Sequence, residues 1–547
     1  MKTSTWQHRI ALSTAAAGLL LLSACGGEEG AAGSTSTTGA VTAQEALADD
    51  VEPHADGDDA EDAEGAADTA GATTVTLADG ASTSSDEGAA TVDGDTVTIS
   101  AAGTYVLSGS LDDGRVVVSS EGDGEVRLVL DGVDITSESD SPLIVTQADA
   151  VTVVLAEDSQ NALADGAGSA ADDDEEDAAN ATLWSSDDLT IAGSGALSVT
   201  SQEADGITSK DGLVVLGGTI TVDAGDDGIR GKNYLALDGG TIEIRAGGDG
   251  LKSDDDTEDG TGYVLLDGAT VTADVGDDGI SATTDALVVS GSLDVTATAP
   301  ADEQDPSPKG INAGTIVAIS GGEVTVDYSE EAIQGTVVSI TDGTVDLTST
   351  DDGINASSGS GESMAAEDGV ELVVSGGTVT VDAEGDGLDS NGTSTITGGT
   401  VVVDGPTRDG NGALDAAGGT TVDGGSLVAV GSAGMAEAPA DGSDQGWLQA
   451  SLGTAAAGAE VAVQDEDGHE VATHTLAKAA ANVVVANDDI EAGRTYTVLV
   501  DGRQVASVTA GESTGGGMGG GPGGGGPGDA PAGGGPGGDM APPDRQE

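Results

Sequence analysis

Residues 223–256 read DAGDDGIRGKNYLALDGGTIEIRAGGDGLKSDDD, and an acidic turn phrase occurs in them twice. The Asp-Gly pairs of the two copies start at Asp227 and Asp249, 22 residues apart, with the short apolar runs YLAL and TIEI between them. At ~3.3 Å per strand residue, a 22-residue circuit accommodates three short strands and three turns. Because a period of this length is typical of solenoids, the stretch predicts one rung of a stacked β structure.

The phrase recurs along the chain. Lys309-Gly-Ile and Glu331-Ala-Ile are degenerate copies, and Gly-Gly or Ser-Gly corners followed by Thr-(Ile/Val)-x-(Ile/Val) lie between copies. Leucine-rich repeats, nine-residue calcium rolls and propellers have other signatures. We therefore predict an all-β fold, a right-handed parallel β-helix with three-strand rungs of about 22 residues. The complete Asp-Gly-(Ile/Leu) copies start at Asp205, Asp227, Asp249, Asp278, Asp352 and Asp386.

Composition fits thin stacked layers better than one large globular core. The 547 residues include 90 Gly and no Phe, and the formal net charge is −84. A field of that sign repels nucleic acid and anionic membrane surfaces, and it favours divalent cations. An acidic surface that only keeps an exported protein soluble is the alternative.

The first 25 residues have the layout of an export signal. Lys2 and Arg9 precede an apolar stretch that is too short to span a membrane, and it ends in Leu-Ser-Ala-Cys. That ending resembles a bacterial lipobox, so we expect lipid attachment at Cys25, the single cysteine of the chain. We accordingly expect an exported protein that is lipid-anchored to the cell membrane or cell surface.

The remaining chain divides by composition. Residues 26–72 and 512–547 lack apolar periodicity and cannot offset the entropy of ordering, so we expect a disordered acidic tether and a disordered Gly/Pro-rich tail. We expect the β-helix over 73–430, with an acidic loop insertion at 163–181, and a small β cap region over 445–511. We find no convincing amphipathic helix after the signal.

Stacked rungs would place the acidic turns in a row, about 4.8 Å apart. Like charges at that spacing repel unless something neutralises them. Ca²⁺, which takes six to eight oxygen ligands, is one candidate for neutralising this row. A second group of acidic residues follows Lys252. The candidate metal ligands are Asp226, Asp227, Asp249, Asp254, Asp255, Asp256, Asp277 and Asp278.

Basic residues are the other candidate neutraliser. Five of the 15 Lys and Arg residues follow these turns: Lys210, Arg230, Lys232, Lys252 and Lys309. They either pair with neighbouring Asp residues and join the rungs, or form a mixed site in which Lys232 and Lys252 bind glycan. The four His residues lie in the signal, the tether and the C-terminal segment, a distribution that argues against a zinc site.

Several phrases resemble a bacterial family of carbohydrate-binding-domain β-helix proteins. They include GTYVLSGSLDDGRVVV (103–118), VRLVLDGVDIT (126–136) and LWSSDDLTIAGSGALSV (183–199), followed by the stretch quoted above. The resemblance runs from about Val92 to Gly424. It implies a pectate-lyase-like fold, calcium bound at the turns around Asp226, Asp227, Asp249 and Asp277–Asp278, and binding of cellulose or acidic, pectin-like cell-wall polysaccharides.

Three functions remain open on the sequence. The first is calcium-dependent polysaccharide binding without catalysis by a monomer with no nucleic-acid partner. The second is a calcium-dependent polysaccharide lyase, in which a basic side chain removes the proton next to the uronate carboxylate; Lys252 is the first candidate base and Arg230 the second. The third is a structural spacer or adhesin.

Overall fold

The computed structural model describes residues 39–48, 50, 53, 69–138, 140–166, 179–299, 307–359 and 365–513. Residues 39–547 form one unit, which is the one described below. The predicted signal, Cys25, most of the tether, the centre of the acidic insertion and nearly all of the tail lie outside the described residues. Within the described ranges, no helix is both long enough and apolar enough to cross a membrane.

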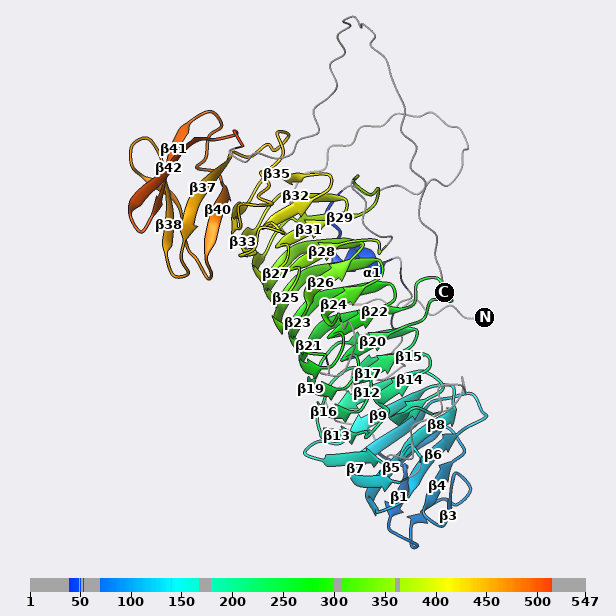
Figure 1. The fold of residues 1–547 in the computed structure, drawn as a ribbon. Helices are drawn as coiled ribbons and strands as arrows, with labels where there is room; N and C mark the ends of the chain where they lie inside the picture. The colour runs from blue at the N-terminus through cyan, green and yellow to red at the C-terminus, as the bar shows by residue number, and fades with distance from the viewer. Residues whose placement is uncertain are drawn as a thin grey trace, which may run out of the picture. The chain divides into compact units, whose positions relative to one another are not determined.

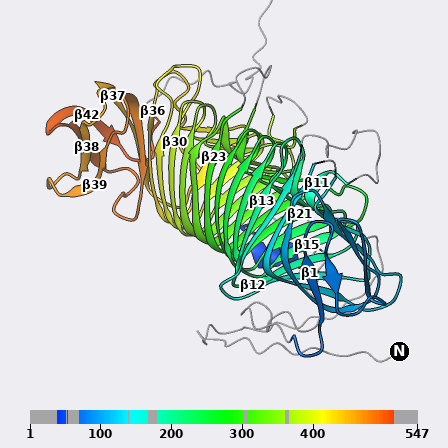
Figure 2. The ribbon, with the colours of Figure 1, turned by 90° about the horizontal axis from the view of Figure 1, so that it is seen from below.

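The fold is an all-β solenoid of parallel strands, stacked in chain order (Figures 1 and 2). A representative rung consists of β14 (Asp205–Ser209), β15 (Gly212–Val215) and β16 (Thr219–Ala224). Each of these strands pairs in parallel with its counterpart in the next rung, which consists of β17 (Ile229–Gly231), β18 (Tyr234–Leu237) and β19 (Thr241–Ala246). The 22-residue period therefore corresponds to one three-strand circuit, as predicted.

The first sheet is formed by the strands that follow the acidic turns. Most of its strands are short, because a turn lies at each end of the strand. In most copies, Gly occupies the position after the acidic residue. The sheet contains, in order, β3 (Ala90–Asp93), β4 (Thr96–Ile99), β6 (Arg115–Ser119), β8 (Leu143–Gln147), β11 (Ala181–Ser185), β14 (Asp205–Ser209), β17 (Ile229–Gly231), β20 (Leu251–Ser253), β22 (Ile280–Ala282), β24 (Lys309–Ala313), β26 (Glu331–Gly335), β28 (Ile354–Ala356), β31 (Leu388–Ser390) and β34 (Leu414–Ala416).

The other two strands of each rung belong to one large sheet, and in several rungs they merge into a single bent strand such as β21 (Tyr263–Val275). Its members are β1 (Thr73–Leu77), β2 (Thr83–Ser84), β5 (Gly103–Leu111), β7 (Val126–Ser137), β9 (Val151–Leu155), β10 (Gln160–Asp165), β12 (Leu189–Gly193), β13 (Ala196–Thr200), β15 (Gly212–Val215), β16 (Thr219–Ala224), β18 (Tyr234–Leu237), β19 (Thr241–Ala246), β21 (Tyr263–Val275), β23 (Asp285–Ala297), β25 (Ile316–Tyr328), β27 (Val337–Ser349), β29 (Glu371–Val374), β30 (Thr378–Ala383), β32 (Thr393–Ile396), β33 (Thr400–Asp404), β35 (Thr420–Val422), β36 (Ser426–Gly431), β37 (Trp447–Ala455) and β40 (Ala480–Ala486).

The core is a set of aliphatic columns. The Ile or Leu after each acidic turn points inward, and one column contains Ile207, Ile229, Leu251 and Ile280 in direct register. All four side chains are buried. Since each column adds one aliphatic layer per rung, the lack of Phe is consistent with this core.

The C-terminal β region continues from the last rung. Strand β40 pairs antiparallel with β36, so the backbone of β36 is hydrogen-bonded on that side instead of exposed. A separate core around Val461, Val483 and Tyr496 supports this region. Its own sheet contains β39 (Glu470–Thr475), β38 (Glu460–Gln464), β41 (Thr495–Val500) and β42 (Arg503–Thr509).

Two local expectations differ from the structure. The predicted insertion at 163–181 starts too early, because β10 continues to Asp165, where the Asp165 carboxylate binds the hydroxyls of Thr182 and Ser201. The predicted tether contains a helix, α1 (Ala43–Leu47), which packs on the outer face of the solenoid beside Leu287 and Ala318. A Thr42–Glu45 capping box starts this helix, and apolar burial holds it in place.

Candidate functional site

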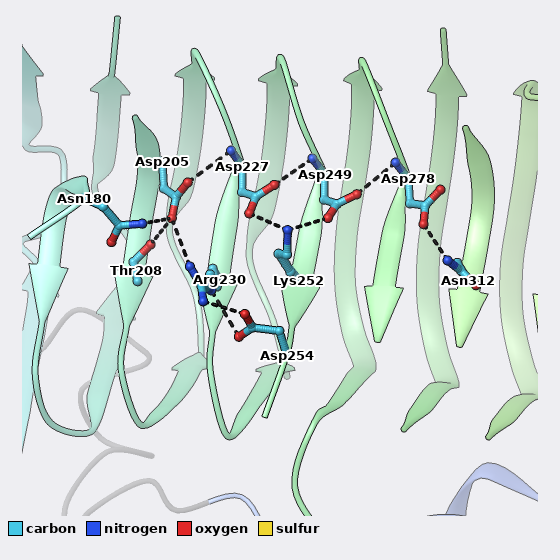
Figure 3. A network of polar contacts seen from close by, with 10 residues as sticks. All are labelled: Asn180, Asp205, Thr208, Asp227, Arg230, Asp249, Lys252, Asp254, Asp278 and Asn312. Carbon is cyan, nitrogen blue, oxygen red and sulfur yellow. Dashed lines mark hydrogen bonds and ion pairs between the residues drawn. The ribbon is translucent and has the colours of Figure 1, made fainter. Parts of the chain in front are cut away.

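The predicted acidic row exists, and its first role is structural. Asp205, Asp227, Asp249 and Asp278 are buried at equivalent positions of four successive rungs. In each, the Oδ1 atom accepts a hydrogen bond from the backbone N–H of the next residue in the row, at 3.2 Å for Asp227, 2.9 Å for Asp249 and 3.0 Å for Asp278 (Figure 3). Lys309 N–H donates to Asp278 in the same way, at 2.8 Å. The row therefore ties each turn to the next.

Basic and amide side chains bind the second oxygen of these carboxylates (Figure 3). The Lys252 ammonium lies 2.8 Å from Oδ2 of both Asp227 and Asp249. The Asn312 amide donates to Asp278 Oδ2 at 2.7 Å. Lys252 therefore pairs with Asp residues of two rungs, which is one of the two alternatives that the sequence left open.

Arg230 joins the same network one rung earlier. Its guanidinium donates to both oxygens of Asp254, at 3.1 and 2.5 Å, and approaches Asp205 Oδ2 at 3.8 Å. Asn180 and Thr208 also donate to Asp205 Oδ2, each at 2.9 Å. Arg230 is thus a bidentate partner of a carboxylate, a geometry that fixes the orientation of its side chain.

The protonation of Lys252 and Arg230 follows from these contacts. Burial opposes the charge of Lys252, but Asp227 and Asp249 outweigh it and raise the Lys252 pKa above its ordinary value. Burial likewise opposes the charge of Arg230, and Asp254 raises the Arg230 pKa. Both side chains are therefore cations at neutral pH, which disfavours either as the base of a lyase.

Asp205 and Asp278, the carboxylates on either side of the two that Lys252 bridges, favour their neutral, protonated form. Burial raises the pKa of Asp205 to about 7, and the negative charge of Asp227 adds to the effect. Burial also raises the pKa of Asp278 to about 7, although Asn312 opposes the shift. A cation that approached either carboxylate would stabilise its charged form.

Two clusters of three carboxylates could hold such a cation. Asp205 lies with Asp226 and Asp227, and Asp249 lies with Asp277 and Asp278; in each cluster one oxygen per residue lies within 4.8 Å of the others. Asp226 and Asp277 are exposed, so each cluster has a side open to solvent. Hard oxygen donors of this kind fit Ca²⁺, whose remaining ligands would be carbonyls, water or a bound anion.

The other predicted ligands do not join these clusters. Asp254 is the ion-pair partner of Arg230. Asp255 is buried in its own loop, where it binds the hydroxyls of Thr257 and Thr261 at 2.6 and 2.7 Å. Asp256 is exposed, and Lys232, the other predicted glycan-binding residue, is half-buried beside the turn. The residues that were predicted to form one mixed site around Lys252 therefore make separate contacts.

Further along the stack, the basic residues of this face are replaced. Asn355 pairs in register with Asp389, and Asp389 pairs in register with Asp415. Asp389 and Asp415 thus occupy the position of Lys252 in the rungs four and five beyond that of Ser281. Burial is the first cause that raises the pKa of Asp352 to about 8 and of Asp389 to about 7, with neighbouring carboxylates adding to it. The row thus continues with carboxylates, but a carboxylate replaces the basic residue at the position that Lys252 occupies.

Sequence reasoning missed two sets of residues. Asp205 was identified as a repeat copy but not as a ligand; Ala204 precedes it, whereas a second Asp precedes Asp227 and Asp278. Asp465, Asp467 and His469 form a third group that could hold a cation, in the turn between β38 and β39. The phrase DEDGHE (465–470) is its sequence signal.

Parts of this chain are similar to known proteins. A carbohydrate-binding domain-containing protein of Acetivibrio thermocellus is 37% identical over 128 residues, which are 23% of this chain and 45% of the relative. The chain thus matches less than half the length of that relative.

A solved structure described as the polysaccharide lyase-like protein from C. thermocellum, gadolinium derivative, is 27% identical to this chain. The match covers 49% of this chain and 97% of that one, with a TM-score of 0.40. Residues 93–353, which include both three-carboxylate clusters, match the model of the family described as carbohydrate-binding domain-containing protein.

Proposed function

We propose that this protein binds polysaccharide, acidic pectin-like or cellulosic glycan, in a calcium-dependent manner and without catalysis, as an exported lipoprotein anchored through Cys25. The main observation in support is that the region similar to the carbohydrate-binding domain family contains two solvent-open carboxylate clusters. We also assign the solenoid a right-handed parallel β-helix, in keeping with the strong right-handed preference of parallel strand connections.

Charge explains why a metal belongs to this proposal. A chain with a net charge of −84 repels an anionic polymer. Calcium bound at a cluster supplies a positive centre that protein carboxylates and a uronate carboxylate can share. Asp226 and Asp277 are the residues that would face the polymer, since Asp205, Asp227, Asp249 and Asp278 are buried in the row.

The lyase is the second candidate, and the spacer or adhesin is the third. The geometry weakens the lyase because its two candidate bases, Lys252 and Arg230, are held as cations by carboxylates. The carboxylate clusters are unnecessary for a spacer, so cation binding separates the spacer from the first two.

The experiment is a titration of the chelator-stripped protein with Ca²⁺, followed by polygalacturonate with and without the metal. Absorbance of an unsaturated product is recorded in the same samples. We expect saturable calcium binding and calcium-dependent polymer binding with no product. Product formation would instead support the lyase, and no binding of either ligand would support the spacer.

A further inference from the structure

Two copies of the acidic turn differ at a single position. Residues 248–253 read GDGLKS and residues 385–390 read GDGLDS, so Asp389 stands where the first copy has Lys252. The backbone register agrees with this alignment, because Lys252 and Asp389 lie in one row along the first sheet. The second copy therefore has a third carboxylate in place of the cation.

The carboxylate pair around this position is retained. In the first copy, Lys252 lies 2.8 Å from Oδ2 of both Asp227 and Asp249 (Figure 3). Asp352 and Asp386 take these places in the second copy, and Asp352 Oδ1 accepts the Asp386 N–H at 2.7 Å. The Oδ2 atoms of Asp352 and Asp386 have no hydrogen-bond or ion-pair partner among the described residues. The pair is thus built like the first one but lacks its ammonium group.

Two buried oxygen atoms next to this position also lack a donor. Asn355 is in direct register with Asp389, and its amide donates to Glu331 Oε1 at 3.2 Å. The other oxygens of these two side chains, Asn355 Oδ1 and Glu331 Oε2, are buried and accept no hydrogen bond within the described part of the chain. Since a buried acceptor without a donor costs free energy, this part of the face favours a ligand that brings donors and positive charge.

The arrangement of the oxygens favours an organic cation over a metal ion. Within the described ranges, the acidic groups that converge closely enough for one metal ion are the two clusters described above and the one between β38 and β39. Asp352, Asp386 and Asp389 do not form such a group. Asp389 instead pairs in register with Asp415, so the carboxylates repeat along the stack at about 4.8 Å.

We propose that the second half of the row, Asp352, Asp386, Asp389 and Asp415, binds a linear polyamine, whose ammonium groups take the place that Lys252 fills in the first half. One ammonium group donates to Asp352 and Asp386, and the next donates to Asp389 and Asp415. A spacer of three methylene groups matches a carboxylate repeat of about 4.8 Å. Lysine side chains on one face of an extended peptide repeat at about 6.8 Å and match it less well.

This inference goes beyond calcium and polysaccharide binding, and it depends on neither. Hydrogen bonds between ammonium and carboxylate groups hold the polyamine, so a chelator leaves its binding intact. The net charge of −84 attracts any polycation weakly. Salt at physiological strength screens that diffuse attraction more than it screens contacts with the half-buried Asp352, Asp386 and Asp389.

The test is calorimetric titration of the full chain with norspermidine, a triamine with two three-carbon spacers, in chelator and at physiological ionic strength. We expect one saturable class of sites in the wild type. Asp389→Lys should weaken this binding by about tenfold or more, because the new ammonium bridges Asp352 and Asp386 as Lys252 bridges its own pair. Asp274→Lys makes the same charge change at an exposed residue outside the row and should bind like the wild type.

A second variant, Asp352→Asn with Asp389→Asn, removes two of the four carboxylates while keeping the shape of both side chains. It should also lose binding, and its melting temperature at neutral pH should not fall, because less like charge remains in the row. This variant decides the matter if Asp389→Lys does not fold.

Three results would overturn the proposal: no saturable norspermidine binding by the wild type, unchanged affinity in both row variants, or an equal loss in Asp274→Lys. Tighter binding of trilysine than of norspermidine would overturn the assignment to a polyamine. Calcium-dependent binding of polygalacturonate, measured on the same proteins without chelator, tests the proposed function separately and should persist in every variant.

Discussion

Lys252 neutralises two carboxylates that are only 4% and 5% exposed, Asp227 and Asp249. Removing one partner of a buried ion pair leaves uncompensated charge and is strongly destabilising. We predict that Lys252→Met lowers the free energy of unfolding by about 3 kcal/mol at neutral pH. Calorimetric melting measures the loss, and it should shrink at low pH, because burial raises the pKa of Asp227 and favours its neutral form there.

Lys309→Met is the control for that substitution. It removes the same charge, but the Lys309 ammonium bonds only to Ser307 and has no ion-pair partner among the described residues. A loss of stability as large as that of Lys252→Met would mean that overall charge, and not the bridge between rungs, sets the effect.

Asp352 offers a contrast within the same row. It accepts the backbone N–H of Asp386 at 2.7 Å, as Asp227 accepts that of Asp249, but burial raises its pKa to about 8. Asp352→Asn keeps an acceptor and removes an unfavourable charge, so we predict a higher melting temperature at pH 8. Asp227→Asn should lower it, because Lys252 loses a carboxylate. Shifts of the same sign would contradict this difference between the two halves of the row.

At the scale of the element, α1 acts as a short strap on the outer face of the solenoid. Ala43 and Ala46 are buried against a cluster that includes Leu265, Leu287 and Ala318. The Ala43 N–H also donates to Ser320 Oγ at 2.7 Å, and the Val41 N–H to Ser339 Oγ at 2.9 Å. A five-residue helix is not stable alone, so these tertiary contacts hold it.

We predict that Ala46→Asp detaches this helix, because it buries a charge in an apolar contact. Hydrogen exchange of residues 43–47 should then rise strongly. Gln44→Asp places the same charge on the exposed side of the helix and should leave exchange nearly unchanged. Equal protection in both variants would show that the apolar contact does not hold the helix.

At the scale of the molecule, the acidic row makes stability depend on pH. Burial raises the pKa of Asp386 to about 6, of Asp389 to about 7 and of Asp352 to about 8. Unfolded aspartates titrate near 3.9, so the folded state binds more protons between about pH 4 and pH 8. The free energy of unfolding should therefore fall as pH rises through that window.

Melting temperatures measured across that range, at constant ionic strength, check this expectation. The triple variant Asp352→Asn, Asp386→Asn, Asp389→Asn should flatten the fall. A melting temperature that rises steadily from pH 4 to pH 8, or a profile unaffected by the triple variant, would contradict it.

How far the sequence predicts this molecule depends on whether a feature repeats. The column that contains Ile207 and the row that contains Asp227 follow from the 22-residue period, because register aligns equivalent residues. The sharing of Lys252 by two rungs depends on where a long side chain points, which spacing alone does not specify. The α1 helix was missed for lack of apolar periodicity, although Thr42 and Glu45 form a capping box that could have identified its start.

The central claim is that the two carboxylate clusters bind the calcium through which polysaccharide attaches. The most direct measurement is calorimetric titration of polygalacturonate, with and without Ca²⁺, into the wild type and into Asp226→Asn, Asp277→Asn. Both substitutions are exposed and spare the buried row. We predict calcium-dependent binding that the double variant loses while its melting temperature stays near that of the wild type. Equal, calcium-dependent binding by both proteins would contradict the assignment of the clusters.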